Sequence, residues 1–156
     1  MQKFHVVLHQ PRIPQNTGNI GRLCFASNTA LHLIHPLGFQ LSSKELKRAG
    51  MDYWNELELY EWNDFESFLQ ATSNQSLKHF YLTTKSQQPY YNADLKGGAY
   101  LHFGREDSGL ENSLIQQYSS QTLTIPMQNN ARSLNLATSA GIVLYEGIRQ
   151  RDSLHL

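Results

Sequence analysis

Six short runs rich in β-branched, aromatic and other apolar residues recur along the chain, and they constrain its fold more than any other feature. The runs cover residues 4–8, 31–34, 57–60, 79–83, 100–103 and 122–125. Most of them are separated by segments in which apolar residues have helical spacing, such as Phe65, Phe68 and Leu69. Strands that alternate with helices predict an α/β fold with a mainly parallel sheet flanked by helices.

The segment 135–149 has the strongest helical pattern in the chain. Leu136, Ala140, Val143 and Gly147 fall on one stripe of the predicted helix. Because this stripe is built from small residues, it would let the helix of a second copy approach closely. We therefore expect a homodimer.

The stretch 86–98 has the weakest pattern. It holds Pro89, Asn92 and the pair Gly97-Gly98, which are residues typical of turns and loops. We expect a mobile loop here.

Length and composition suit one domain over residues 1–156, since 40% of the residues are hydrophobic. The opening residues MQKFHVVLHQ are too short and too interrupted for a signal peptide, and no apolar run reaches membrane length. We expect a cytoplasmic protein with no membrane partner. Cys24 is the only cysteine, and its apolar neighbours indicate a buried thiol.

The charge balance is even, with 13 basic and 13 acidic residues. A zero net charge disfavours a protein that coats nucleic acid indiscriminately, because that mode depends on a large basic excess. A local basic patch remains open, since Lys44, Lys47 and Arg48 share one side of a short predicted helix.

The seven histidines do not have the spacing of a metal site. His5 and His9 lie roughly 13 Å apart on one predicted strand, too far to share one ion. His32 and His35 would face opposite sides of the next strand. We expect core or surface histidines and no metal.

Three polar loops each follow a predicted strand and lead into a helix. Parallel strands end at one edge of a sheet, and open α/β sheets bind ligands at that edge, so we expect one composite site. In the third loop Ser133 is also a candidate helix N-cap. The polar and glycine residues are Asn16, Asn19 and Arg22 in the first loop, Gly104, Glu106 and Gly109 in the second, and Ser133 and Asn135 in the third.

These loops resemble the three motifs of the SPOUT superfamily of RNA methyltransferases. Within it the chain is most similar to the small, single-domain TrmL (YibK) family, a resemblance that extends to RAGMDYW at 48–54 and LTTK at 82–85. It departs at Ala131 and Ala137, where relatives often have serine. The matching stretches are Asn16-x-Gly18-Asn19-Ile20-x-Arg22, Phe103-Gly104-x-Glu106-x-x-Gly109-Leu110, Ile125-Pro126-Met127 and Arg132-Ser133-Leu134-Asn135-Leu136.

The resemblance implies a deep trefoil knot near the C-terminus and a homodimer that binds S-adenosylmethionine in that knot, without metal. The implied reaction methylates the ribose 2′-hydroxyl of the wobble nucleotide, position 34, in the anticodon stem-loop of tRNA, and releases S-adenosylhomocysteine. Leucine tRNA isoacceptors are the expected substrates.

The resemblance also assigns roles by motif position. The residues expected to face the reacting ribose are Asn16, Arg22, Glu106 and Asn135, with Tyr145 nearby. Arg22 would either act as base or stabilise the oxyanion, and it would act across the dimer. The expected cofactor residues are Leu82, Thr83, Gly104, Gly109, Ile125, Met127, Ser133 and Leu134.

Three other functions stay open at this stage. A related 2′-O-methyltransferase could act on another tRNA position or on ribosomal RNA. A non-catalytic RNA-binding module could keep a vestigial cofactor pocket. A small-molecule methyltransferase would suit the zero net charge, although the basic face of Lys44, Lys47 and Arg48 counts against it.

Overall fold

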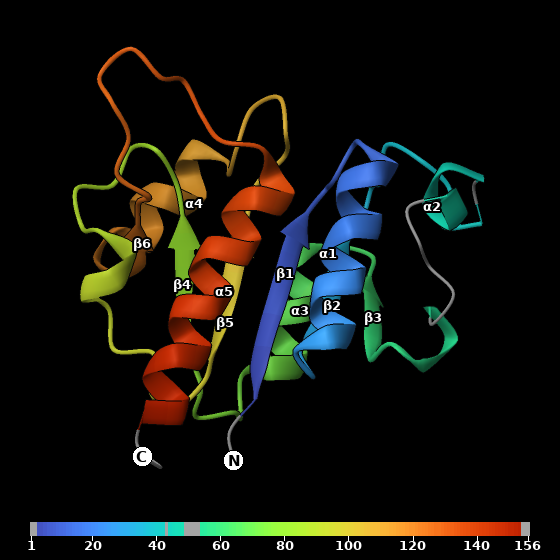
Figure 1. The fold of residues 1–156 in the computed structure, drawn as a ribbon, viewed down its shortest axis with the longest axis horizontal. Helices are drawn as coiled ribbons and strands as arrows, with labels where there is room; N and C mark the ends of the chain where they lie inside the picture. The colour runs from blue at the N-terminus through green and yellow to red at the C-terminus, as the bar shows by residue number, and fades with distance from the viewer. Residues whose placement is uncertain (1–2, 43, 49–53, 154–156) are drawn as a thin grey trace.

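Six parallel strands form one sheet in a computed structural model that describes residues 3–42, 44–48 and 54–153 (Figure 1). The strand order is β3-β2-β1-β5-β4-β6, and every neighbouring pair is parallel. The predicted α/β fold with a mainly parallel sheet is therefore confirmed. The strands are β1 (Phe4–His9), β2 (Ala30–Ile34), β3 (Leu59–Trp62), β4 (Lys78–Leu82), β5 (Ala99–Phe103) and β6 (Thr122–Leu123).

Helices cover both faces of the sheet. Figure 1 shows α1 (Pro14–Ala26) and α5 (Leu136–Asp152) side by side on the near face, with α3 (Phe65–Thr72) behind the strands. The short helix α4 (Asn112–Gln117) follows β5, and α2 (Lys44–Arg48) lies beside α1. Within the described residues there are also three 3₁₀ turns, Trp54–Glu56, Tyr90–Asn92 and Ser119–Gln121.

The two faces of β1 bury different kinds of side chain, because successive residues of a strand point to opposite sides. Phe4, Val6 and Leu8 join the apolar core beneath α1 and α5. Val7 packs on the other face with Phe68 of α3. His5 and His9 share this second face, where they contact other aromatic rings. The sheet is therefore apolar under α1 and α5, and rich in histidine under α3.

The small-residue stripe of α5 packs inside the chain. A Cβ added to Gly147 would lie 2.7 Å from the ring of Phe4, and one added to Gly141 would face Leu23 of α1 at 4.0 Å. These glycines let α5 approach β1 and α1 closely. Phe4 of the same chain fills the space at Gly147, whereas among the described residues Gly141 has only Leu23 at 4.0 Å, so the approach of a second copy to this stripe stays a prediction.

The helix predicted over 135–149 is confirmed and extends to Asp152. Its N-cap is Asn135, whose Oδ1 accepts a hydrogen bond from the Thr138 amide at 3.1 Å. The prediction of Ser133 as the cap is wrong, since the chain reaches the helix two residues later.

The loop at 86–98 is anchored at its centre. Ala93 and Leu95 are buried, and Gln150 of α5 bonds to both backbones: its Oε1 accepts from the Leu95 amide at 2.9 Å, and its Nε2 donates to the Ala93 carbonyl at 3.1 Å. The prediction of a mobile loop is wrong for this part, because the buried side chain of Gln150 supplies the hydrogen bonds that a neighbouring strand or helix would otherwise give to this backbone.

Three remaining expectations concern surface and burial. Lys44 and Arg48 are exposed on α2, whereas the side chain of Lys47 and residues 49–53 of the RAGMDYW segment lie outside the described residues. Cys24 is buried, and burial raises the pKa of its thiol. Within the described ranges, no helix has the length and apolar character needed to cross a membrane.

Candidate functional site

A cavity of about 560 Å³ opens at the carboxyl edge of the sheet. Three connections and the start of α1 form it: residues 82–85 after β4, residues 103–110 after β5, residues 124–127 and 132–136 of the connection from β6 to α5, and Ile13 and Asn16. The volume lies within the range of about 300 to 1,000 Å³ that is usual for small-molecule sites. The loops predicted to form one composite site do meet at one edge.

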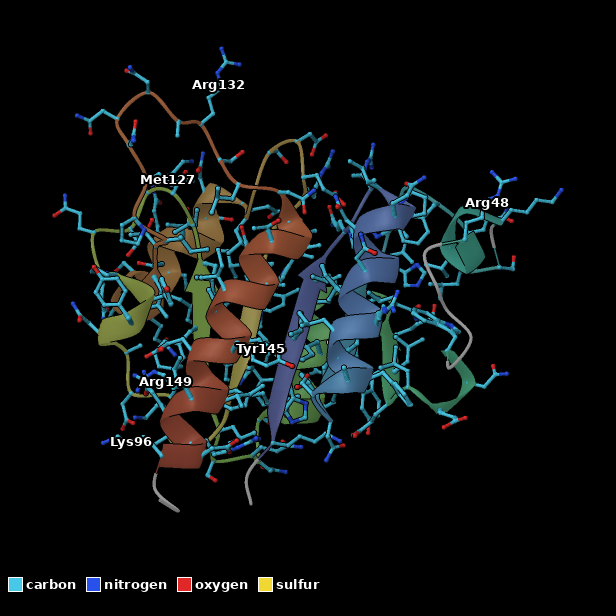
Figure 2. The ribbon with its side chains drawn as sticks, viewed as in Figure 1. Arg48, Lys96, Met127, Arg132, Tyr145 and Arg149 are labelled. Carbon is cyan, nitrogen blue, oxygen red and sulfur yellow. The ribbon has the colours of Figure 1, made fainter. Side chains whose placement is uncertain are left out.

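All eight residues predicted to contact the cofactor line this cavity. Leu82, Ile125 and Leu134 provide apolar surface, while the loop backbones and hydroxyls provide polar groups. Figure 2 shows Met127 and Arg132 on the loop that leads from β6 to α5. Such a mixed lining fits a ligand with an apolar ring and polar substituents, such as S-adenosylmethionine. The eight are Leu82, Thr83, Gly104, Gly109, Ile125, Met127, Ser133 and Leu134.

Two glycines shape the 103–110 loop for different reasons. A Cβ on Gly104 would lie 2.1 Å from the carbonyl carbon of Gly109 and from the amide nitrogen of Leu110, so the loop closes only with glycine there. Gly109 has a φ of +71°, a conformation that suits glycine, and nothing lies within 4 Å of its Cβ position. The requirement at Gly104 is thus the closure of the loop on itself rather than space for a ligand.

Asn16 and Asn135 are joined inside the cavity wall. Asn135 Nδ2 donates to Asn16 Oδ1 at 3.0 Å, while its own Oδ1 caps α5. Asn16 is buried and lines the cavity. The pair therefore ties the first turn of α1 to the first turn of α5.

Glu106 holds the chain just before α1. Its Oε2 accepts from the Arg12 amide at 2.8 Å, and its Oε1 accepts from the Ile13 amide at 3.1 Å. Ile13 is the N-cap of α1 and offers no capping side chain of its own. Glu106 thus supplies acceptors that the start of the helix lacks. It lines the cavity as predicted, but both of its oxygens already bind backbone amides.

Two predicted site residues lie away from this cavity within one chain. Arg22 is exposed on α1, roughly 9 Å along the helix axis from Asn16. Tyr145 is 49% exposed in the middle of α5, and Figure 2 shows it well separated from Met127 and Arg132. The single chain does not bring Arg22 and Tyr145 to the other site residues.

Two basic residues of the cavity wall were not predicted as site residues. Lys85 contacts Asn112 of α4, and Arg132 is exposed on the loop before α5. Both lie within stretches that the resemblance covers, LTTK and Arg132-Ser133-Leu134-Asn135-Leu136, so their position in those motifs was the available signal. Positive charge at this wall is suited to a phosphate-bearing substrate.

The histidines bond to one another across strands. His9 Nε2 lies 2.9 Å from His102 Nδ1, and His102 Nε2 lies 3.0 Å from His79 Nδ1. His5 Nδ1 lies 2.9 Å from His32 Nε2. Burial lowers the pKa of each of these five side chains. The expectation of core histidines is confirmed for His32 and His102, which are buried, whereas His5, His9 and His79 are partly buried.

One hydrogen bond fixes the protons of the His5–His32 pair. Trp62 Nε1 donates to His32 Nδ1 at 3.0 Å, and an indole N–H can only donate. Neutral His32 therefore carries its proton on Nε2 and donates it to His5 Nδ1. Among the described residues, no group of three or more histidine, cysteine or acidic side chains has the arrangement of a metal site.

Comparisons with known proteins give consistent matches over nearly the whole chain. The model of the SpoU rRNA Methylase family matches residues 3–145. A Bacillus subtilis protein, whose assignment as a tRNA (cytidine(34)-2′-O)-methyltransferase is provisional, is 46% identical over 152 residues, which are 96% of this chain and 94% of that protein. An Aeromonas hydrophila protein named tRNA (cytidine(34)-2′-O)-methyltransferase is 42% identical over 146 residues, which are 93% and 92% of the two chains.

Solved structures match equally well. A chain from work on the 2-OH methylation of C/U34 on tRNA has a TM-score of 0.91 at 42% identity, covering 97% of this chain and 98% of that one. An AdoMet-bound rRNA methyltransferase from Sinorhizobium meliloti has a TM-score of 0.85 at 26% identity, covering 94% of this chain and 56% of that one. The sheet and the loops at its carboxyl edge are thus shared with methyltransferases that act on RNA.

Proposed function

We propose that this chain, which belongs to the SpoU rRNA methylase family, transfers a methyl group from S-adenosylmethionine to the ribose 2′-hydroxyl of nucleotide 34 in tRNA. The similar Aeromonas hydrophila protein is named for this reaction on cytidine 34. The observation that carries the proposal is the cavity at the carboxyl edge of the sheet, which gathers all eight residues expected to contact the cofactor. Because the proposed substrate is a transfer RNA, we expect this activity in the cytoplasm.

The cofactor supplies an electrophilic methyl group on a sulfonium centre, and S-adenosylhomocysteine is released. The AdoMet-bound relative supports this choice of methyl donor. In this chain, Leu82, Ile125 and Leu134 would hold the apolar part of the ligand, and the 103–110 loop would hold its polar part. The protein's own contribution is to align the hydroxyl with the methyl group and to exclude water.

The attacking hydroxyl is a very weak acid, so its proton must leave as the new bond forms. We assign Arg22 to this step, either as an oxyanion stabiliser that remains charged or as the base itself. A guanidinium can bind the hydroxyl oxygen and a neighbouring phosphate with its planar set of donors. Asn16 and Asn135, which bond to each other, would hold the ribose edge of the cavity in place.

Arg22 reaches a cavity only if two chains combine. Arg22 and Tyr145 are both exposed, on the neighbouring helices α1 and α5. Phe25 is 39% exposed on α1, which adds apolar surface to this side of the chain. We propose that this side is covered in a homodimer, so that Arg22 of one subunit serves the cavity of the other.

Methyl transfer to defined tRNA tests the function. The purified protein is incubated with radiolabelled S-adenosylmethionine and tRNA, beginning with leucine isoacceptors, and the product is mapped by nuclease digestion and mass spectrometry. We expect one 2′-O-methyl group at position 34. A tRNA with a 2′-deoxynucleotide at position 34 is the control, because it lacks only the attacking hydroxyl.

The other outcomes identify the alternatives. Methylation of another tRNA position or of ribosomal RNA would show a related 2′-O-methyltransferase. RNA binding without transfer to any RNA would show a non-catalytic binding module.

A further inference from the structure

A second cavity, of about 270 Å³, lies between β1, α3 and α4. It shares Arg105 and Gly109 with the cavity of the proposed active site. The 103–110 loop is therefore a wall common to both cavities. A strand of RNA bound at the active site would pass this wall within reach of the second cavity.

The inner surface of the second cavity is apolar and partly aromatic. Phe65 and Tyr118 supply rings, and Ile34, Leu69 and Leu114 supply aliphatic surface. The volume is slightly below the usual range for drug-sized ligands, which suits a single planar ring system. Aromatic and apolar walls of this kind hold the faces of flipped or unstacked bases.

Carboxylates outnumber cations on the polar side of this cavity, and the guanidinium of Arg105 that lines it is already bonded to Asp107. Asp64, Glu66 and Glu111 line it with carboxylates. Asp64 Oδ1 accepts from both the amide and the hydroxyl of Ser67, which lowers the pKa of this carboxyl and leaves Oδ2 available. Carboxylates repel phosphate and accept hydrogen bonds from amino groups, so this lining suits a base that carries an amino group better than a phosphate.

His9 adds one nitrogen to this polar side. Its Nε2 is bonded to His102, and His9 itself lines the cavity. Among the described residues its Nδ1 has no hydrogen-bond partner, so this atom is left for a ligand. An amino donor at Nδ1 places the proton of neutral His9 on Nε2. His9 Nε2 then donates to His102 Nδ1, and His102 Nε2 in turn donates to His79 Nδ1.

We propose that the second cavity binds an amino-bearing base, adenine or cytosine, from a nucleotide next to the one that is methylated. This inference rests on the proposed function, because it requires the RNA strand at the first cavity. Carboxylates accept hydrogen bonds from the exocyclic amino group of cytosine, and adenine offers the same kind of donor.

The test is a cycle between protein variants and RNA variants. Fluorescence anisotropy gives the Kd of a tRNA stem-loop that carries one abasic residue at each position flanking nucleotide 34. Ser113→Phe fills the cavity from an exposed position on α4, and Ser76→Phe is the matched control at an exposed position outside it. All proteins are used as full chains in their native assembly.

In the wild type and in Ser76→Phe, we expect one abasic position to weaken binding by about 5-fold to 150-fold, the range for stacking of one base on an aromatic side chain. Ser113→Phe should bind the intact RNA with a similar loss, and the same abasic residue should then cost it little more. The proposal would be overturned if each abasic residue weakened RNA binding as much in Ser113→Phe as in the wild type. It would also be overturned if no flanking abasic residue weakened binding to the wild type.

A second pair of variants tests the amino group and does not depend on the folding of Ser113→Phe. Inosine replaces adenosine, or uridine replaces cytidine, at the sensitive position. The exchange should weaken binding to the wild type and to the control Glu56→Leu, which is exposed outside the cavity, but not further in Glu111→Leu, which has lost its acceptor oxygens. An equal loss in all three proteins would overturn the assignment of an amino-bearing base.

Methyl transfer to position 34 is measured on the same wild-type preparation. Absence of transfer would refute the proposed function. Methyl transfer, together with abasic residues that weaken binding equally in Ser113→Phe and the wild type, would refute only the proposed binding of a base in the second cavity.

Discussion

A hydrogen bond of 3.0 Å joins Asn135 Nδ2 to Asn16 Oδ1, although the two residues are 119 positions apart in the chain. The bond places the N-terminus of α5 against the first turn of α1, at the wall of the larger cavity. Because Asn135 is also the N-cap of α5, its two functional groups do separate work: the oxygen caps the helix and the amide nitrogen holds Asn16.

Asn135→Ala should therefore cost more than a cap alone. We expect a loss of about 0.5 to 2 kcal/mol for the cap, and a further loss because buried Asn16 Oδ1 loses its donor. Asn135→Asp keeps the cap but cannot donate to Asn16, so it should recover only the stability that the cap contributes. Urea denaturation measures both variants. Equal stability of Asn135→Asp and the wild type would show that the bond to Asn16 contributes nothing.

Arg22→Ala should lower the single-turnover rate of methyl transfer at least about a hundredfold, the usual effect of losing one oxyanion donor. Cofactor affinity should barely change, because none of the eight residues expected to contact the cofactor lies on α1. Appreciable activity in Arg22→Lys would favour charge stabilisation, whereas an inactive lysine variant would favour bidentate geometry or proton transfer.

Mixed dimers test whether Arg22 acts across the interface. An Arg22→Ala subunit combined with a subunit that cannot bind cofactor should regain some turnover, because one of the two cavities is then complete. Sedimentation establishes the dimer in the same samples. A protein that sediments as a monomer at micromolar concentration would contradict the arrangement.

Gly104→Ala and Gly109→Ala should have different effects. At Gly104 the methyl group would overlap the backbone of Gly109 and Leu110, so we expect loss of cofactor binding through a disrupted loop. At Gly109 there is room, and only the positive φ is costly, at about 1 to 2 kcal/mol. Calorimetry with S-adenosylhomocysteine and thermal unfolding separate the two. Normal affinity in a folded Gly104→Ala would contradict the collision expected between the added methyl group and the backbone.

Acidic pH should destabilise the fold through the buried histidines. Burial lowers the pKa of His5 to about 4, and of His9 and His32 to about 3, against about 6.5 in the unfolded chain. Between pH 6.5 and about 4 the unfolded chain binds protons that the folded chain does not. Stability is thus fully present above pH 6.5 and falls below it, by up to about 1.4 kcal/mol per pH unit for each histidine.

Urea denaturation at a series of pH values from 7.5 to 4.5 measures this slope. His5→Gln should reduce the slope, because Gln Oε1 can still accept from His32 Nε2 but does not titrate in this range. His35→Gln is the control, since His35 is partly exposed beside Glu61. A free energy of unfolding that does not change with pH would contradict the expectation that these histidines stay neutral in the folded protein.

Much of the fold could be predicted because it depends on local pattern. Each of the six apolar runs contains or overlaps an observed strand, although the third begins at Leu59 and the sixth ends at Leu123. The sheet order β3-β2-β1-β5-β4-β6 could not be predicted, since it depends on which strands meet after the chain has crossed the sheet. The trefoil knot stays a prediction.

The candidate site also has parts that could be predicted from the sequence and parts that could not. Residues in motifs at strand ends could be placed in one cavity, because parallel strands end at the same edge. The histidine chains could not, because they join different strands: His79 and His102 bond from β4 to β5, a pairing that depends on register. Spacing along single strands, as for His5 and His9, contains no information about such neighbours.

Glu106 makes the two cavities mechanically dependent on each other. It projects from their common wall and holds the amides of Arg12 and Ile13, where α1 begins. A ligand that shifted this wall would therefore also shift the start of the helix that carries Asn16 and Arg22. Were the cofactor and the RNA coupled in this way, the factor by which the cofactor tightens RNA binding would equal the factor by which RNA tightens cofactor binding.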